Sequence, residues 1–192
     1  MTKKRSMAAI AAPLDEVHAA KVSELWDLLE RELGLTQAAA ISPVPHFSFQ
    51  SARDYDLALL ADVVEKIASA ARPLRVHTAG VGVFPGAAPV VYIPVVRSPE
   101  LTRLQVALWS AGAVATDKPL PEYHPAAWIP HVTLAQGDVS SRTVGAAIQL
   151  LNERDLTWDL AVDSLAIIRG RGDQPQAVLG TYRFAGGSAR NF

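Results

Sequence analysis

The sequence predicts an α+β fold that contains a duplicated unit, with helices covering the outer faces of its sheets. Short β-prone runs alternate with amphipathic helical stretches, a pattern typical of sheets with helices packed against them. A motif of proline, histidine, any residue and a hydroxyl residue occurs twice, at 45–48 and at 130–133. The order strand, helix, strand, turn, strand follows from each copy, which indicates an internal duplication of a supersecondary unit.

Length and composition favour a single domain. The chain has 192 residues, of which 49% are hydrophobic and 19% are charged, a balance ordinary for globular proteins. We expect one domain over residues 1–192, with residues 1–6 as a flexible tail. The two repeated units are expected at about 41–96 and 128–184.

Charge and cysteine content exclude several classes of function. The net charge of −1 gives no general affinity for nucleic acid, so any RNA contact would be local and short. The absence of cysteine excludes disulfides, thiolate zinc sites and cysteine nucleophiles, and it fits a reducing cytoplasm. The basic N-terminus precedes no persuasive signal segment, and no apolar run is long enough to span a membrane. We expect a soluble cytoplasmic protein that contacts no membrane and requires no protein partner.

The first elements follow from hydrophobic patterning. Residues 7–12 predict a short buried strand. Apolar residues at three- and four-residue steps then predict a helix over 15–33, and Gly34 supplies its end. Residues 41–49 predict a strand, and its two prolines indicate an edge position or an irregular start.

The middle of the chain continues the alternation. Ser51 and Asp54 resemble a capping box that would start a second helix, whose apolar stripe runs over 57–67. Residues 74–84 predict a strand. A turn rich in proline and glycine separates it from a β-prone run at 90–96.

A third helix and the second motif follow. Ser98 is a candidate N-cap, and the helix that it opens carries leucines over 101–108. Residues 112–128 contain three prolines and are expected to form a loop. The strand that contains the second motif is expected over 128–135.

The second half repeats the order of the first. Residues 144–151 predict a helix and 156–168 predict a strand. Gly170 and Gly172 mark a turn, and a last strand is expected over 177–184.

The two motifs carry the chemistry. Alternate residues of a strand share a face, so His46 lies beside Ser48, and His131 lies beside Thr133. If the repeats pack symmetrically, these faces meet across a cleft. Two opposed imidazoles suit in-line displacement at phosphorus, where one accepts a proton and the other donates one. The two hydroxyls would bind phosphate oxygens, and this chemistry needs no metal or other cofactor.

Beyond the two motifs, the segments 82–85, 89–95 and 98–101 also match a known pattern, and the likeness extends over about residues 7–184. The chain resembles the 2H phosphoesterase superfamily, which is named for two H-x-(T/S)-x motifs. Within it, the chain is most similar to the bacterial 2′-5′ RNA ligase and RNA 2′,3′-cyclic phosphodiesterase branch.

This resemblance implies a bilobal α+β fold with two small antiparallel sheets around a central cleft. It implies hydrolysis of 2′,3′-cyclic phosphate RNA ends, or reversible joining of 2′-5′ RNA linkages. Carried over to this chain, His46 and His131 form the acid–base pair, and Ser48 and Thr133 are phosphate ligands. Which histidine is the acid stays open. Ser48 departs from the threonine that is commoner in the first motif.

Further residues are weaker candidates for substrate binding. Phe84 ends a strand beside the expected cleft and would stack on a base. Arg169 and Arg171 stand at the equivalent turn of the second half, where a cation would help to bind a phosphate. His124, in the proline-rich loop, is a candidate for the substrate rim. Three tryptophans are expected in the core: Trp26, Trp109 and Trp158.

Three other functions compete with this interpretation. The same chemistry on a small cyclic nucleotide or an ADP-ribose derivative would show a shallower salt dependence than binding of long RNA. A non-catalytic nucleotide- or RNA-binding module would keep the fold but would not need two histidines placed for proton transfer. A zinc hydrolase would lose its activity on addition of a chelator.

Overall fold

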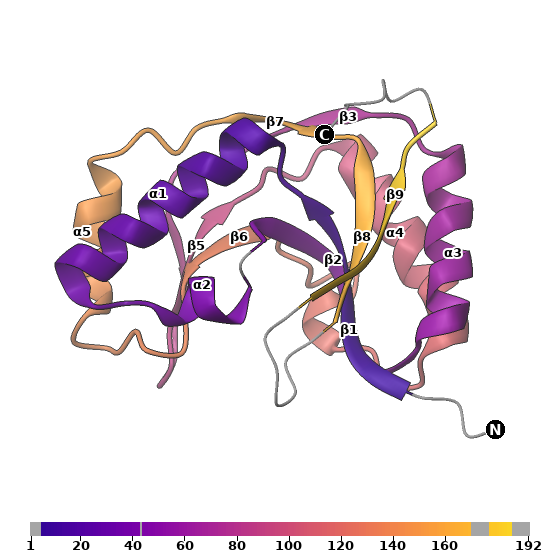
Figure 1. Ribbon diagram of the computed structural model, residues 1–192, viewed down its shortest axis with the longest axis horizontal. Helices are drawn as coiled ribbons and strands as arrows, with labels where there is room; N and C mark the ends of the chain where they lie inside the picture. Colours follow the sequence, from indigo (N-terminus) through magenta and orange to yellow (C-terminus); the bar gives the residue numbers. More distant parts are fainter. Residues whose placement is uncertain (1–4, 43, 170–176, 186–192) are drawn as a thin grey trace.

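A computed structural model describes residues 5–42, 44–169 and 177–185. It has two lobes, each a small antiparallel sheet with helices on one face (Figure 1). The cleft between the lobes is a cavity lined by residues of both sheets. The four-stranded sheet has the order β2-β1-β8-β9, with bounds His46–Asp56, Arg5–Pro13, Ser164–Arg169 and Ala177–Arg183. The three-stranded sheet has the order β4-β5-β6, with bounds Gly82–Phe84, Val90–Pro94 and His131–Ala135. A two-stranded ribbon pairs β3 (Leu74–His77) with β7 (Asp159–Val162).

Each sheet combines strands from both halves of the chain. The strand with the first histidine, β2, shares its sheet with the β8–β9 hairpin of the second half. The strand with the second histidine, β6, pairs with β5 of the first half. The first strand, β1, separates β2 from β8, whereas β6 pairs with β5 directly. Neither half therefore completes a sheet alone.

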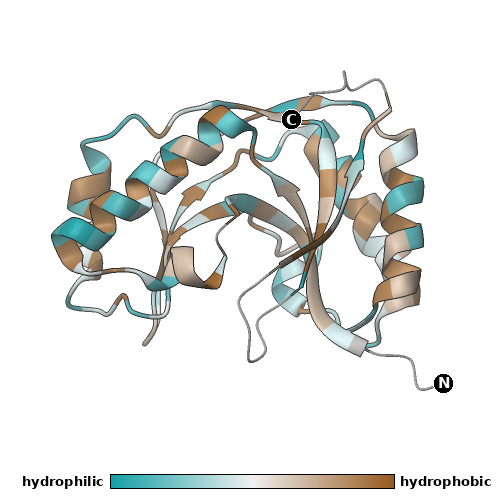
Figure 2. Cartoon of the chain, viewed as in Figure 1, coloured by the Kyte–Doolittle hydropathy of each residue, from teal (hydrophilic) through white to brown (hydrophobic). Residues whose placement is uncertain are grey.

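The helices cover the faces of the sheets that point away from the cleft. The three-stranded sheet is covered by α1 (Glu16–Leu33) and α5 (Val144–Asn152), and the four-stranded sheet by α3 (Leu57–Ala70) and α4 (Pro99–Gly112). Hydrophilic and hydrophobic residues alternate along α1 and α3, as expected for helices with one buried face (Figure 2). None of the helices in the described ranges is both long and apolar enough to cross a membrane.

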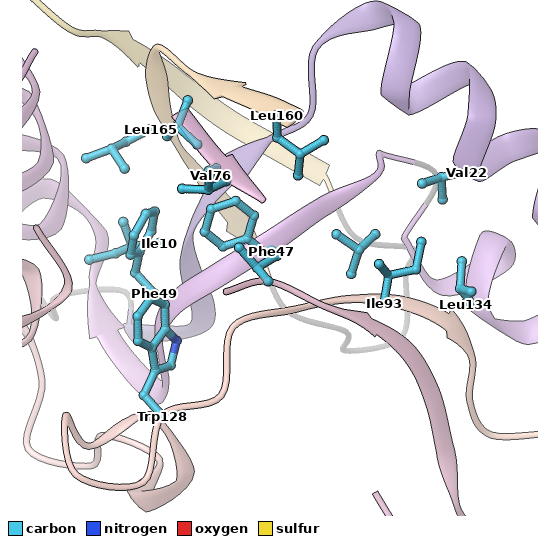
Figure 3. Packing of buried hydrophobic residues seen from close by; sticks show 14 of the residues in the cluster. Ile10, Val22, Phe47, Phe49, Val76, Ile93, Trp128, Leu134, Leu160 and Leu165 are labelled. Atoms are coloured by element: carbon cyan, nitrogen blue, oxygen red, sulfur yellow. The ribbon is translucent and has the colours of Figure 1, made fainter. Parts of the chain in front are cut away.

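The core is one large hydrophobic cluster that extends through both lobes. Figure 3 shows Val22, Ile93 and Leu134 together on the side of α1, and Phe49 beside Trp128. A smaller cluster of Ala11, Ala166 and Ile168 lies apart from it. The register pairs Ser48 with Ala11, and Ala11 with Ala166, so this small cluster lies on the same face of the sheet as Ser48.

Several expected element boundaries are wrong. Ser51 and Asp54 form no capping box, because β2 continues to Asp56 in its pairing with β1. Asp56 itself caps α3, accepting hydrogen bonds from Ala58 N–H at 3.2 Å and Leu59 N–H at 3.3 Å. The strand expected over 41–49 begins only at His46, and a short helix, α2 (Gln37–Ile41), precedes it.

The strands expected over 74–84 and 156–168 each divide into two. Between β3 and β4 the chain passes Gly80, whose φ of 69° is left-handed and cannot continue a strand. The expected loop over 112–128 contains two short 3₁₀ helices, one of which is η2 (Pro121–Tyr123). The turn expected at Gly170 and Gly172 lies outside the described residues.

Candidate active site

The two histidine motifs enter their strands in the same way. In each motif the histidine is the first residue of its strand and follows a proline. The carbonyl oxygen of that proline accepts a backbone hydrogen bond: Leu14 N–H donates to Pro45 at 3.0 Å, and Val95 N–H donates to Pro130 at 2.9 Å. Because the backbone before each histidine makes the same kind of hydrogen bond, the two histidines have equivalent backbone environments in different sheets.

The aliphatic–proline–histidine sequence determines the tautomer of each imidazole. His46 Nδ1 lies 2.8 Å from Val44 O, and His131 Nδ1 lies 2.7 Å from Ile129 O. A residue before proline is held extended, which directs its carbonyl away from the helical path. Because a carbonyl oxygen only accepts, Nδ1 must carry the hydrogen in both rings. Nε2 is therefore the nitrogen left to exchange a proton with a ligand.

The side chains of both motifs line one cavity. His46, Ser48, His131 and Thr133 all belong to the wall of a cavity of about 200 Å³, and each of them is half-buried. The cavity lies where β2 and β6, from different sheets, approach each other. Its wall also includes Trp26, Ser42, Tyr123 and Gln136.

Burial lowers the pKa of both histidines below the ordinary value of about 6.5. The bond of Nδ1 to a backbone carbonyl opposes this effect in each ring, but burial outweighs it. His131 lowers the pKa of His46 further, because two imidazolium cations facing one cavity repel each other. The neutral, Nδ1-protonated form is therefore favoured at neutral pH.

A second cavity, of about 510 Å³, adjoins the first and shares four of its wall residues: Tyr123, His131, Thr133 and Gln136. Its remaining wall is mainly apolar and includes Phe84, Val90, Trp128 and Ile129.

Aromatic rings stack at one wall of this second cavity. The rings of Phe84 and Tyr92 are stacked with centroids 4.2 Å apart, and His131 meets Phe84 edge-on at 4.9 Å. The close approach needs Gly82, which lies opposite Tyr92 in the ladder, because a Cβ there would collide with the tyrosine ring.

Two indole groups hold the motif strands. Trp26 Nε1 donates to Thr133 O at 3.2 Å, and Trp128 Nε1 donates to Ser48 O at 2.8 Å. Trp26 is 9% exposed, so it lies in the core as expected and also lines the cavity. Trp128 leads into β6 but binds β2, and therefore links the two sheets directly.

The other predicted residues are placed differently. Phe84 borders the second cavity and not the first. The register pairs Arg169 with Ala8, which places Arg169 on the face of the sheet opposite to Ser48. The predicted contact of Arg169 with a phosphate therefore gains no support from the sheet register and stays a prediction. His124 is exposed to solvent, and its ring meets the ring of Trp109 edge-on. It lies outside the described walls of both cavities. Arg171 lies outside the described residues.

Sequence reasoning missed Tyr123, which lines both cavities, and Trp128. Tyr123 stands in a proline-rich loop with no periodicity, so neither its burial nor its direction could be read from the pattern. Trp128 is preceded by the same loop. The available signal was the presence of two aromatic residues shortly before the second histidine.

In the described part of the chain, no three histidine or carboxylate side chains are grouped to hold a metal ion. The walls of the two cavities contain no lysine or arginine among the described residues.

Comparisons with known proteins relate the chain to one family. A family model described as "2'-5' RNA ligase superfamily" matches residues 13–174. Proteins named "Putative phosphoesterase" from Bacillus cereus and Bacillus anthracis are each 26% identical over 147 residues, covering 75% of this chain and 81% of theirs.

Solved structures share the fold. The structure of TT0787 from Thermus thermophilus superposes with a TM-score of 0.67 at 18% identity, covering 95% of this chain and 99% of that one. Escherichia coli LigT in apo form gives a TM-score of 0.59 at 16% identity, with the same coverage. LigT has also been solved in complex with 3′-AMP, and that structure gives a TM-score of 0.56 at 14% identity, covering 94% of this chain and 98% of that one.

Proposed function

Because the chain belongs to the 2′-5′ RNA ligase superfamily, we propose that it is a metal-independent phosphoesterase that uses His46 and His131 as an acid–base pair. Its proposed substrates are 2′,3′-cyclic phosphate ends of RNA, or 2′-5′ RNA linkages that it joins reversibly. The observation that carries the proposal is the wall of a single cavity, to which both motifs contribute an imidazole and a hydroxyl. In both imidazoles Nδ1 is engaged by the backbone, and Nε2 remains for chemistry.

In hydrolysis, the neutral imidazole of one histidine accepts a proton from water through Nε2 as the water oxygen bonds to phosphorus. The bond from phosphorus to the ribose 2′- or 3′-oxygen breaks on the opposite side. The second histidine, as imidazolium, donates its Nε2 proton to that leaving oxygen. The pair ends with its protonation states exchanged, and the reverse reaction uses a ribose hydroxyl as the nucleophile.

The hydroxyls of Ser48 and Thr133 stabilise the negative charge that develops on the non-bridging phosphate oxygens. Each lies two residues after its histidine on the same face of a strand, so imidazole and hydroxyl reach the same phosphate. Preorganised donors of this kind act most strongly in a site with little water. The limited volume of the first cavity supports this role.

The second cavity suits the nucleoside that carries the phosphate. It adjoins the phosphate cavity through His131 and Thr133, and the ring of Phe84 offers a stacking surface at its wall. Stacking accepts any base, so little base preference is expected.

A small cyclic nucleotide is the second candidate substrate. The described walls of both cavities lack lysine and arginine, and the net charge is −1. These features favour a single phosphodiester end over a long polyanion.

The test is hydrolysis of all four nucleoside 2′,3′-cyclic phosphates by the wild-type protein in the presence of EDTA. We expect turnover that is insensitive to the chelator, with rates that differ little among the four bases. Activity that is lost in EDTA and restored by zinc would support the zinc hydrolase. Binding of the cyclic nucleotides without turnover would support the non-catalytic module.

The pH dependence follows from the lowered pKa of both histidines. The base must be neutral and the acid protonated, so kcat/KM is greatest between the two pKa values of the free enzyme. Both lie below about 6.5, so activity is expected to peak on the acidic side of this value and to fall as the acid loses its proton at higher pH. Initial rates between about pH 4.5 and 8.5, at substrate concentrations far below KM, measure this profile. An optimum above about pH 7.5 would contradict it.

A further inference from the structure

Among the described residues, the walls of the two cavities carry a single formal charge. Glu122 is the only lysine, arginine, aspartate or glutamate in those walls, and it lines the second cavity alone. The two histidines favour their neutral form at neutral pH, because burial lowers the pKa of both. The described walls therefore present one negative charge to a substrate that is itself an anion.

The backbone fixes Glu122 at the mouth of the second cavity. Glu122 is the middle residue of η2, and its exposed side chain borders the cavity from the solvent side. Leu120 N–H donates to Ser51 O at 2.9 Å, which holds the start of this turn on β2. The buried side chain of Gln105 donates through Nε2 to Tyr123 O at 2.8 Å and holds its end on α4. The turn is thus anchored on both sides of Glu122.

The charge of Glu122 acts on the wall that the two cavities share. Tyr123 lines both cavities, and burial raises the pKa of its phenol. The carboxylate of Glu122 raises this pKa further, so the two groups lie close enough to interact. No cation of the described ranges forms an ion pair with Glu122. Its charge is therefore reduced only by solvent and salt.

The chemistry of a carboxylate determines which group it tolerates beside the nucleoside. An ionised carboxylate only accepts hydrogen bonds, so a free 5′-hydroxyl can donate one to it. A 5′-phosphate carries a charge of about −1.5 to −2 at pH 7 and is repelled. The phosphodiester that joins a terminal nucleotide to the rest of an RNA chain carries one negative charge and is repelled less strongly.

We propose that Glu122 is a specificity-determining residue that selects against a second phosphate, so that the preferred substrate is a mononucleoside 2′,3′-cyclic phosphate with a free 5′-hydroxyl. This inference rests on the proposed function of the two cavities. It ranks the small cyclic nucleotide above the end of an RNA chain.

The chemistry of this substrate indicates the reaction that supplies it. In RNA cleavage by transesterification, a 2′-hydroxyl loses its proton and its oxygen bonds to the adjacent phosphorus. The bond from phosphorus to the next 5′-oxygen breaks, and that oxygen takes up a proton. One fragment then ends in a 2′,3′-cyclic phosphate and the other begins with a 5′-hydroxyl. Cleavage on both sides of one nucleotide releases the preferred substrate.

The test compares adenosine 2′,3′-cyclic phosphate with its 5′-phosphorylated form, in EDTA and low salt at about pH 7. In wild type we expect kcat/KM to be about fivefold lower for the 5′-phosphorylated form. The difference should lie mainly in KM, because the second phosphate meets the carboxylate in the ground state and in the transition state alike. Glu122→Gln removes the charge and should reduce the ratio to less than about twofold. Added salt should lower the wild-type ratio in the same direction.

Glu30→Gln is the matched control for the loss of a carboxylate. Glu30 is an exposed residue of α1 outside the described walls of both cavities, so this variant should keep the wild-type ratio. The same ratio in Glu122→Gln as in wild type would overturn the proposal. Faster turnover of the 5′-phosphorylated form by wild type would overturn it too.

Calorimetric binding of the same two nucleotides separates this inference from the proposed function. If wild type hydrolyses neither nucleotide, the proposed function fails, and their affinities still decide the role of Glu122. Weaker binding of the 5′-phosphorylated form by wild type, relieved in Glu122→Gln, would support the inference. Equal affinities, or no binding of either nucleotide, would overturn it.

Discussion

Replacement of either motif histidine by alanine, His46→Ala or His131→Ala, is expected to lower kcat/KM for a nucleoside 2′,3′-cyclic phosphate by about 10²–10⁴-fold. In the proposed mechanism each variant removes the Nε2 that takes up or releases a proton on its side of the phosphate, since Nδ1 of each ring is held by a backbone carbonyl. Initial rates in EDTA measure the effect. Since either reaction direction needs both an acid and a base, the two losses should be similar in size.

His77→Ala provides the matched control. His77 lies in β3, where its exposed side chain pairs with Asp159, outside the described cavity wall and in a different sheet from either motif. This variant should keep wild-type activity. In the two motif variants, binding of the nucleotide should stay within about tenfold of wild type, since only the transition state needs the proton transfer. An equal loss of binding and turnover would instead favour a binding module.

Removal of a motif hydroxyl has the second-largest expected effect. Ser48→Ala and Thr133→Val are each expected to lower kcat about 10²-fold, the cost of one preorganised donor to a developing oxyanion. Thr133→Val keeps the β-branch and the volume of the side chain, so the loss reports the hydroxyl alone. The same assay with saturating substrate measures it.

The hydroxyl-preserving exchange Thr133→Ser is the control for this prediction. It retains the donor and should lose less than about tenfold, the effect of a more mobile hydroxyl. A change confined to KM in Ser48→Ala or Thr133→Val would contradict transition-state stabilisation and leave only a contribution to ground-state binding.

Much of the fold follows from local patterns. Gly34 ends α1 and Ser98 caps α4 as predicted, because capping depends on side chains within a few residues. Strand ends were predicted less well. Ser51 and Asp54 looked like a helix start, yet pairing with β1 extends β2 past them. A strand ends where its partner ends, and the partner is distant in the sequence.

The candidate site divides in the same way. The sequence by itself determined that His46 shares a face with Ser48, and His131 with Thr133, because the period of a strand is a local property. Only the tertiary structure decided which residues of the other half of the chain lie next to each histidine and hydroxyl. The exchange of strands between the halves puts Phe84 beside His131, and the packing of a proline-rich loop on β2 brings Tyr123 into the wall of the cavity that Ser48 also lines. These contacts depend on long-range pairing and burial, for which no periodic pattern within one segment can serve as a signal.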